Sequence, residues 1–176
     1  TKKYKLGNPF ESETTLGPLA KLSGANYVRE QIKMAQADGA KALIDAKLFP
    51  EDNGEGNYLA PQVLINVNHQ MSVMKDESFG PVVGIMKVKD DQEAISLMND
   101  SEFGLTASIW TSDYERAIQI GDRVETGTWF MNRCDYLDPE LAWTGVKDTG
   151  KGCTLSKLGY EQLTRPKSYH LRNDWN

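Results

Sequence analysis

The sequence predicts an α/β fold built around a parallel sheet. Short apolar segments at residues 81–88, 105–111 and 128–131 alternate with amphipathic segments that are suited to helices. Parallel strands need helical crossovers and are covered on both faces, so near-continuous apolar strands between helices are typical of this class. We therefore expect three parallel strands between residues 81 and 131, with right-handed crossovers between them.

Length, charge and composition indicate an ordinary globular protein. A chain of 176 residues is close to one domain of about 150 residues, and a core of that size needs no disulfide or metal. The net charge is −5 with both signs interspersed, so we expect no nucleic acid and no membrane as partners. Two cysteines without a readable signal peptide predict a reducing compartment, cytoplasmic or organellar, and we take the cytoplasm as the expectation.

The first half of the chain predicts one helix between extended segments. The helix is capped by Ser23 or Asn26 and runs through about Ala37, where the Asp38-Gly39 pair ends it. The other predicted elements of this half are a connector rich in glycine and proline at residues 1–18, strands at 40–46 and 58–67, and an acidic, glycine-rich loop at 51–56.

The second half repeats helices and strands and then changes to a glycine-bearing loop. Asp90 or Asp91 caps a predicted helix over residues 92–98, and Asp113 caps a helix that runs to about Val124. The remaining predicted elements are the loop at residues 145–152, a short helix at 155–162 and a last strand at 167–171.

The histidines and cysteines are weak candidates for chemistry. His69 and His170 are far apart in the sequence and lack other ligands at metal-binding spacing, so no metal site is expected. Cys134 follows the end of a predicted strand, where α/β proteins bind ligands, and is a candidate nucleophile with His69 as its base. The alternative for Cys134, and more so for Cys153, is a small residue packed in a loop.

The segment from Glu77 to Pro81 is a tight entry from a loop into a strand. One interpretation is a clamp for a ribose, in which the Glu77 carboxylate accepts both hydrogen bonds of a vicinal diol and the ring of Phe79 covers the sugar or base. The other interpretation is an exposed glutamate beside a core phenylalanine. The spacing of these residues does not decide between the two.

A series of motifs along the chain does favour one interpretation. Residues 75–81 contain Glu-x-Phe-Gly-Pro. The other motifs are Gly7-Asn8-Pro9 with Gly17-Pro18-Leu19, the apolar segment at 57–67, Phe103-Gly104-Leu105-Thr106-Ala107, Gly127 to Asn132, and Trp143 to Gly152. In order and register, over about residues 7–171, this series resembles the NAD(P)-dependent aldehyde dehydrogenase superfamily. The chain departs from the family pattern at Thr144, where a glycine is usual, and at Cys153, where an arginine is usual.

The resemblance implies a fold, a domain division and an assembly. Residues 1–163 would be the C-terminal portion of a Rossmann-like catalytic domain with a parallel sheet. Residues 164–176 would be an oligomerisation strand and tail that joins the sheet of a neighbouring subunit, in a homodimer or homotetramer. The alternative is an edge strand that folds back on its own domain, because Pro166 and Lys167 are residues that protect a sheet edge.

The resemblance also implies site residues. Glu77 would bind the nicotinamide-side ribose of NAD or NADP, and Phe79 would pack against the cofactor. The segment at 133–143 would line the aldehyde tunnel, with substrate-pocket positions at Asp135, Tyr136, Leu137 and Trp143. A tryptophan wall favours an apolar or aromatic aldehyde, whereas an aspartate favours a cationic one, so the substrate stays open.

The catalytic residues of the superfamily are not found in this sequence. Its nucleophile occurs in an Asn-x-Gly-Gln-x-Cys context, which neither Cys134 nor Cys153 fits, and its general-base glutamate and Gly-x-Thr-x-x-Gly loop are missing as well. We expect the chain to be the C-terminal third of an enzyme that oxidises an aldehyde to a carboxylic acid through a cysteine thiohemiacetal, and to be inactive alone. The alternatives are a non-catalytic truncated paralogue or fragment that acts by association, and a cysteine hydrolase at Cys134.

Overall fold

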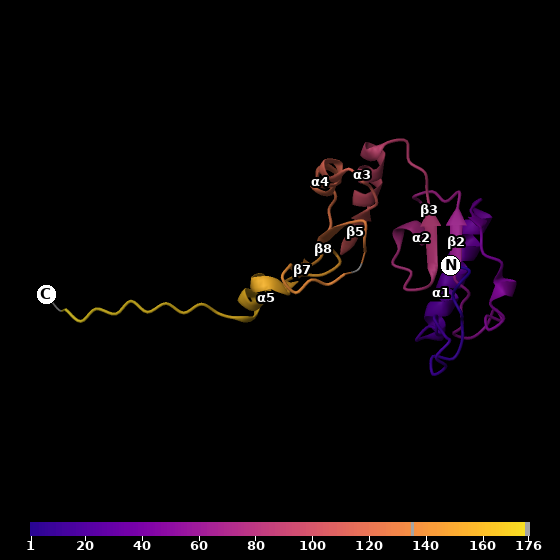
Figure 1. Ribbon diagram of the computed structural model, residues 1–176, viewed down its shortest axis with the longest axis horizontal. Coiled ribbons are helices and arrows are strands. Elements are labelled where there is room, and N and C mark those ends of the chain that lie inside the picture. Colours follow the sequence, from indigo (N-terminus) through magenta and orange to yellow (C-terminus); the bar gives the residue numbers. More distant parts are fainter. Residues whose placement is uncertain (135, 175–176) are drawn as a thin grey trace. The chain divides into compact units, whose positions relative to one another are not determined.

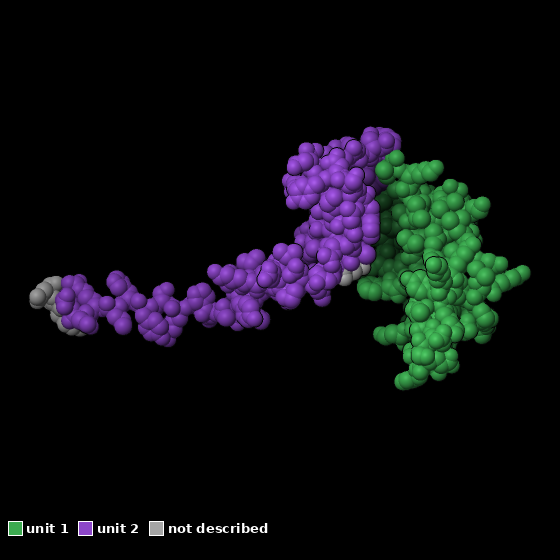
Figure 2. Space-filling model, in the orientation of Figure 1, with its two compact units in different colours: residues 1–88 green, residues 89–176 purple. Residues whose placement is uncertain are grey.

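The computed structural model (Figure 1) describes residues 1–134 and 136–174. These residues separate into two compact units, residues 1–88 and residues 89–176 (Figure 2). Each unit has its own strands and helices. The expected boundary at residue 163 divides a catalytic portion from an oligomerisation strand rather than one compact unit from another, and it stays a prediction.

The first unit is a small mixed sheet with helices. Its elements are α1 (Leu22–Ala37), β1 (Lys41–Ala42), the 3-10 helix η1 (Ala46–Leu48), β2 (Gln62–Ile65), α2 (Ser72–Lys75) and β3 (Val82–Ile85). The strand order is β1-β2-β3, with β1 antiparallel to β2 and β2 parallel to β3. Figure 1 shows β2 and β3 side by side, joined through α2. The three strands lie inside the predicted segments but are shorter.

Helix α1 buries one face against this unit. Its buried residues Ala25, Val28, Gln31 and Ala35 follow helical spacing. The predicted caps are wrong: α1 begins after Lys21 with no side-chain cap, because the Lys21 carbonyl already accepts the backbone N–H groups of residues 24 and 25. The predicted end after residue 37 is confirmed.

Two apolar clusters hold the first unit together. The larger consists of Ala35, Ala40, Leu64, Val67, Met71 and Val73 and lies between α1, β2 and α2. The smaller joins Leu6 to Phe49 and Ala60. Because Leu6 is only 3% exposed, the opening segment is part of this core as well as a connector.

The second unit contains the β-α-β arrangement that the sequence predicts. Its elements are α3 (Asp91–Asn99), β4 (Phe103–Gly104), β5 (Thr106–Ile109), α4 (Tyr114–Gly121), β6 (Thr128–Met131), β7 (Trp143–Thr144), β8 (Val146–Lys147), β9 (Cys153–Thr154) and α5 (Ser156–Leu163). Strands β5 and β6 are parallel and are joined by α4. The Asp90 and Asp113 carboxylates accept from the backbone N–H groups of Glu93 and Arg116, so both predicted caps are confirmed.

The expected set of three parallel strands is only partly confirmed. The β5–β6 pair is parallel as predicted. Strand β3 also pairs in parallel, but its neighbour within the first unit is β2, a pairing that the sequence did not predict. Since β3 and β5 belong to different units, a pairing between them stays a prediction.

The segment after α5 is exposed and belongs to no sheet of the described structure. Residues 164–174 form neither helix nor strand in the described structure, and they continue from α5 as an extended chain (Figure 1). The predicted strand at 167–171 is therefore wrong as an element of this chain's own sheets, and so is the alternative that it folds back on its own domain. Isolated extended backbone lacks the partner strand that its hydrogen bonds require.

No helix in residues 1–134 and 136–174 is long and apolar enough to cross a membrane. The cytoplasmic location stays a prediction.

Candidate functional site

The loop between α2 and β3 carries the two predicted cofactor residues. Asp76 caps α2 in an extended conformation, and β3 begins at Val82. Glu77 is exposed and has no hydrogen-bond or ion-pair partner among the described residues. Phe79 is 84% exposed and has a φ of 46°. The structure therefore excludes the interpretation of Phe79 as a core residue and leaves both side chains free to meet a ligand.

Helix α1 holds this loop through residues that the sequence did not single out. The Tyr27 hydroxyl donates a hydrogen bond to Asp76 Oδ2 at 2.8 Å, and Gln31 Nε2 donates one to the Tyr27 hydroxyl at 3.3 Å. The hydrogen bond to Asp76, with smaller contributions from burial and the carboxylate charge, raises the pKa of Tyr27 above its usual 10.0. Neither tyrosine nor glutamine has a sequence signal that marks this role.

The predicted substrate-pocket residues lie in the second unit. Tyr136 and Leu137 are 52% and 56% exposed, and Trp143 is partly buried in β7. The Arg133 guanidinium lies 3.7 Å from the centre of the Tyr136 ring, in a cation–π contact. Asp135 lies outside the described residues. The predicted cofactor residues, Glu77 and Phe79, belong to the first unit, and the predicted substrate-pocket residues belong to the second.

Asn132 lies where the chain leaves β6 and enters the predicted substrate-pocket segment at residues 133–143. Its side-chain amide donates to the Thr111 carbonyl at 2.7 Å and accepts from the Thr111 N–H at 2.9 Å. This pair of bonds ties the end of β6 to Thr111, two residues after the end of β5. Asn132 has a φ of 55°, a conformation that asparagine tolerates better than most residues, and the chain turns out of the sheet there.

The two departures from the family pattern are direct neighbours. Thr144 in β7 is the register partner of Cys153 in β9. The Thr144 hydroxyl donates to the Gly152 carbonyl at 2.8 Å, a bond that a glycine at position 144 cannot make. The residues that are unusual in this chain therefore meet in one pair of strands beside Trp143.

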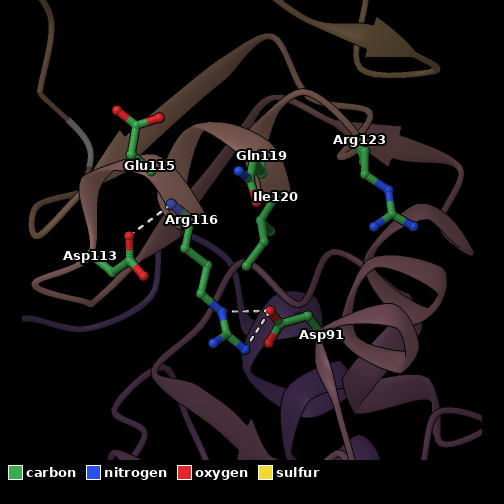
Figure 3. Close-up of a pocket in the computed structure, with 7 residues that line it drawn as sticks. All are labelled: Asp91, Asp113, Glu115, Arg116, Gln119, Ile120 and Arg123. Atoms are coloured by element: carbon green, nitrogen blue, oxygen red, sulfur yellow. Dashed lines mark hydrogen bonds and ion pairs between the residues drawn. The ribbon is translucent and has the colours of Figure 1, made fainter.

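Two surface grooves of about 400 Å³ lie away from these residues. Figure 3 shows the one between α3 and α4, where Arg116 binds Asp91 at 2.6 to 2.7 Å. The second is lined by α1 and the first two strands, and Arg29 and Asp52 form an ion pair at 3.0 Å beside it. The Arg116–Asp91 pair joins α3 to α4 in the first groove, and the Arg29–Asp52 pair joins α1 to the loop before β2 beside the second.

The Cys–His alternative gains no support from the positions of its residues. Cys134 is exposed and lies in the second unit, and His69 lies in the first. Among the described residues, no three His, Cys, Asp or Glu side chains gather closely enough to hold a metal ion.

Comparison with known proteins adds an independent line of support. Residues 1–169 match the family model described as "Aldehyde dehydrogenase family". The chain is 39% identical over 159 residues to succinate semialdehyde dehydrogenase [NAD(P)+] Sad of Escherichia coli. The aligned segment covers 90% of this chain and 34% of that protein. It is 33% identical over 174 residues to lactaldehyde dehydrogenase of Methanococcus maripaludis, with 98% and 36% covered.

Solved structures give the same result. A betaine aldehyde dehydrogenase double mutant from Staphylococcus aureus, crystallised with NAD+, superposes with a TM-score of 0.80 at 32% identity, over 91% of this chain and 32% of that one. The structure of Gox0499 superposes with a TM-score of 0.84 at 32% identity, over 97% and 37%. The parallel-sheet, Rossmann-like α/β fold predicted from the sequence is thereby confirmed. The chain spans about a third of the length of the relatives that it matches.

Proposed function

The chain belongs to the aldehyde dehydrogenase family, and from this premise we propose that it is part of an enzyme that oxidises an aldehyde to a carboxylic acid with NAD(P)+. In the proposed reaction a cysteine thiolate from outside these residues attacks the aldehyde carbon to form a thiohemiacetal. Loss of a hydride from that carbon gives a thioester, and water hydrolyses the thioester to release the carboxylic acid and the thiolate. The nicotinamide, when bound, accepts the hydride. The 176 residues supply cofactor positioning, part of the substrate pocket and subunit contacts.

The observation that carries this proposal is the exposed Glu77–Phe79 pair. A carboxylate with no protein partner can accept both hydroxyl hydrogens of a ribose, and these charge-assisted bonds are stronger than neutral ones. The exposed ring of Phe79 gives a flat apolar surface two residues away. The acceptor oxygens of Glu77 and the apolar ring of Phe79 therefore fit the ribose side of a nicotinamide dinucleotide, NAD or NADP.

The substrate contacts are proposed for the second unit. Tyr136, Leu137 and Trp143 present aromatic and aliphatic surface, which suits the side chain of an aldehyde. Asp135, for which the same role is predicted, would add a negative charge. The relatives named above act on aldehydes of different charge, by their names, so we propose an aldehyde without choosing its side chain.

The source of the nucleophile is open to a direct test. Sequencing the encoding reading frame and measuring the intact mass of the native protein show whether an Asn-x-Gly-Gln-x-Cys segment precedes residue 1. Its presence supports the enzyme. Its absence supports the alternative of a folded module that acts by association.

Replacing Glu77 with glutamine in the full-length enzyme is expected to slow hydride transfer about tenfold or more. The amide cannot accept two hydrogen bonds with a full negative charge, so the nicotinamide is held less well near the adduct. The rate is measured in a single turnover with an aldehyde deuterated at its reacting carbon. Aldehyde KM is expected to change less than the hydride-transfer rate.

The matched control is Glu51→Gln, which changes an exposed glutamate of the same unit. It is expected to behave as the unchanged enzyme. Equal single-turnover rates for Glu77→Gln and the unchanged enzyme would remove Glu77 from the cofactor site.

Deleting the chain from Arg165 onward is expected to reduce the full-length enzyme to a smaller assembly. Tyr169 and Leu171 are 71% and 82% exposed and alternate with polar residues, so on a strand they would share one face. We propose that this segment pairs with the sheet of a second subunit. Light scattering measures the mass of the assembly, and an unchanged mass after the deletion contradicts the proposal.

A further inference from the structure

We propose that Tyr27 and Val28, two adjacent residues of α1, form a seat that positions the Glu77–Phe79 loop for the cofactor. The proposal rests on the proposed function, because it assigns a role in cofactor binding. Tyr27 and Val28 are positioning residues, since they act through the loop and do not touch the cofactor themselves.

The first attachment of the loop is the hydrogen bond from Tyr27 to Asp76. At 2.8 Å to a carboxylate oxygen, it is a charge-assisted bond. A phenol has one hydrogen to donate, and here that hydrogen goes to Asp76. The remaining lone pair of the Tyr27 oxygen accepts from Gln31 Nε2. Because the Asp76 carboxylate can only accept, Tyr27 donates its hydrogen to Asp76 and accepts the hydrogen bond from Gln31.

Gln31 completes this arrangement by its bond to Tyr27, although its burial carries an energetic cost. Its side chain is fully buried, and its Oε1 atom has no hydrogen-bond partner in the described structure. A buried amide oxygen without a partner destabilises the fold. The Nε2 group of the same amide donates to Tyr27 and is thereby satisfied.

The second attachment is the packing of Gly80 on Val28. A Cβ atom at position 80 would lie 2.8 Å from Val28 Cγ2, nearer than real contacts allow. Val28 is fully buried and has little freedom to move away. The backbone of Gly80 therefore rests directly on the side chain of Val28.

The two attachments lie on either side of the cofactor residues and determine where they point. On extended backbone, successive side chains face opposite sides. Asp76, with φ −89° and ψ 152°, faces α1, so Glu77 faces away from α1 and is exposed. Phe79 projects outward as well. Adjacent residues of one helix thus hold residues 76 and 80 and leave the side chains of Glu77 and Phe79 exposed to solvent.

The test uses Tyr27→Phe in the full-length enzyme, a change that removes only a hydroxyl. We expect the dissociation constant for NAD+ to rise about three- to tenfold, with little change in aldehyde KM. The melting temperature is expected to fall as well, because the buried Gln31 Nε2 group loses its hydrogen-bond acceptor. The control Tyr4→Phe alters a half-exposed tyrosine of the same unit and is expected to leave NAD+ binding unchanged. A purely structural role for Tyr27 would lower the melting temperature and leave NAD+ binding to the folded enzyme unchanged.

A double-mutant cycle with Glu77→Gln separates the possible outcomes. Because the seat acts through the loop, Tyr27→Phe is expected to weaken NAD+ binding much less once Glu77 is glutamine. Fully additive losses, or NAD+ binding by Tyr27→Phe as tight as in the unchanged enzyme, would overturn the seat and leave the proposed function intact. Unchanged NAD+ binding by Glu77→Gln would overturn the proposed function, and the seat with it.

Asp76→Asn provides a second variant with a spectroscopic readout. We expect the pKa of Tyr27, followed by ultraviolet titration, to fall toward its usual 10.0, and NAD+ binding to weaken as in Tyr27→Phe. A lowered Tyr27 pKa with unchanged NAD+ binding would show that the bond forms but does not position the loop, and would overturn the proposal.

Discussion

The 176-residue chain, given NAD+ and an aldehyde, is expected to form no NADH above the level of a protein-free reaction. A thiolate in contact with the aldehyde carbon is required for the adduct that releases the hydride. Cys153 lies in β9, with its Sγ atom donating to the Thr154 carbonyl at 3.4 Å. Cys134 is exposed and lies outside the family's cysteine motif. Under the proposed function, Glu77 and Phe79 would position the cofactor, and neither cysteine of this chain is expected to act as the nucleophile.

The measurement is the absorbance of NADH with several simple aldehydes. Cys134→Ser and Cys153→Ser are the matched variants, because each removes one of the two thiols. Steady NADH formation that Cys134→Ser abolishes would contradict the expectation and identify Cys134 as a nucleophile. Under the proposed function, the same assay gives NADH when the segment is joined to a sequence that carries the Asn-x-Gly-Gln-x-Cys motif.

Gly127→Ala is expected to destabilise the second unit by about 3 kcal/mol or more. A Cβ atom at this position would overlap the carbonyl oxygen of Thr144, and a backbone atom cannot rotate away as a side chain can. Gly127 directly precedes β6, and Thr144 belongs to β7. The substitution therefore pushes apart the strand that leads to Asn132 and the strand that carries Trp143. The midpoint of urea unfolding measures the effect.

Gly24→Ala is the control for this substitution. It lies in the first turn of α1, and its nearest contact would be Leu19 Cδ2 at an ordinary 3.9 Å. Because alanine favours helix over glycine, the variant is expected to gain up to about 1 kcal/mol. Equal urea midpoints for Gly127→Ala and the unchanged chain would show that β6 and β7 do not approach this closely in solution.

Local signals explain which elements were predictable. The Asp113 cap and the apolar residues of α4 lie within a few positions of one another, and the β5-α4-β6 unit follows from them. The β2–β3 pair was not foreseen, because the helix that joins its strands, Ser72–Lys75, is too short to show a periodic pattern. The caps of α1 were wrong because Ser23 and Asn26 are good capping residues that lie two and five positions after the observed N-cap, Lys21.

The candidate site, too, could be predicted only where its residues lie close together in the sequence. Glu77 and Phe79 were found because they share one short motif with a known family. Tyr27 lies 49 positions away from its partner Asp76, and a single hydrogen bond between distant residues leaves no trace in composition or periodicity. The loop that carries the motif is thus visible in the sequence, whereas the helix residues that hold it are visible only in three dimensions.

Because Phe79 has a left-handed backbone conformation, selection for heat resistance and selection for turnover are expected to favour different residues at position 79. A φ of 46° costs a residue with a Cβ atom about 1 to 2 kcal/mol, and glycine adopts it freely. Directed evolution scored by heat resistance alone would therefore favour glycine there, whereas scoring by turnover would keep the ring. Libraries built from this chain need both scores at residue 79, because their most heat-resistant members are expected to be the ones that have lost the proposed contact surface for the cofactor.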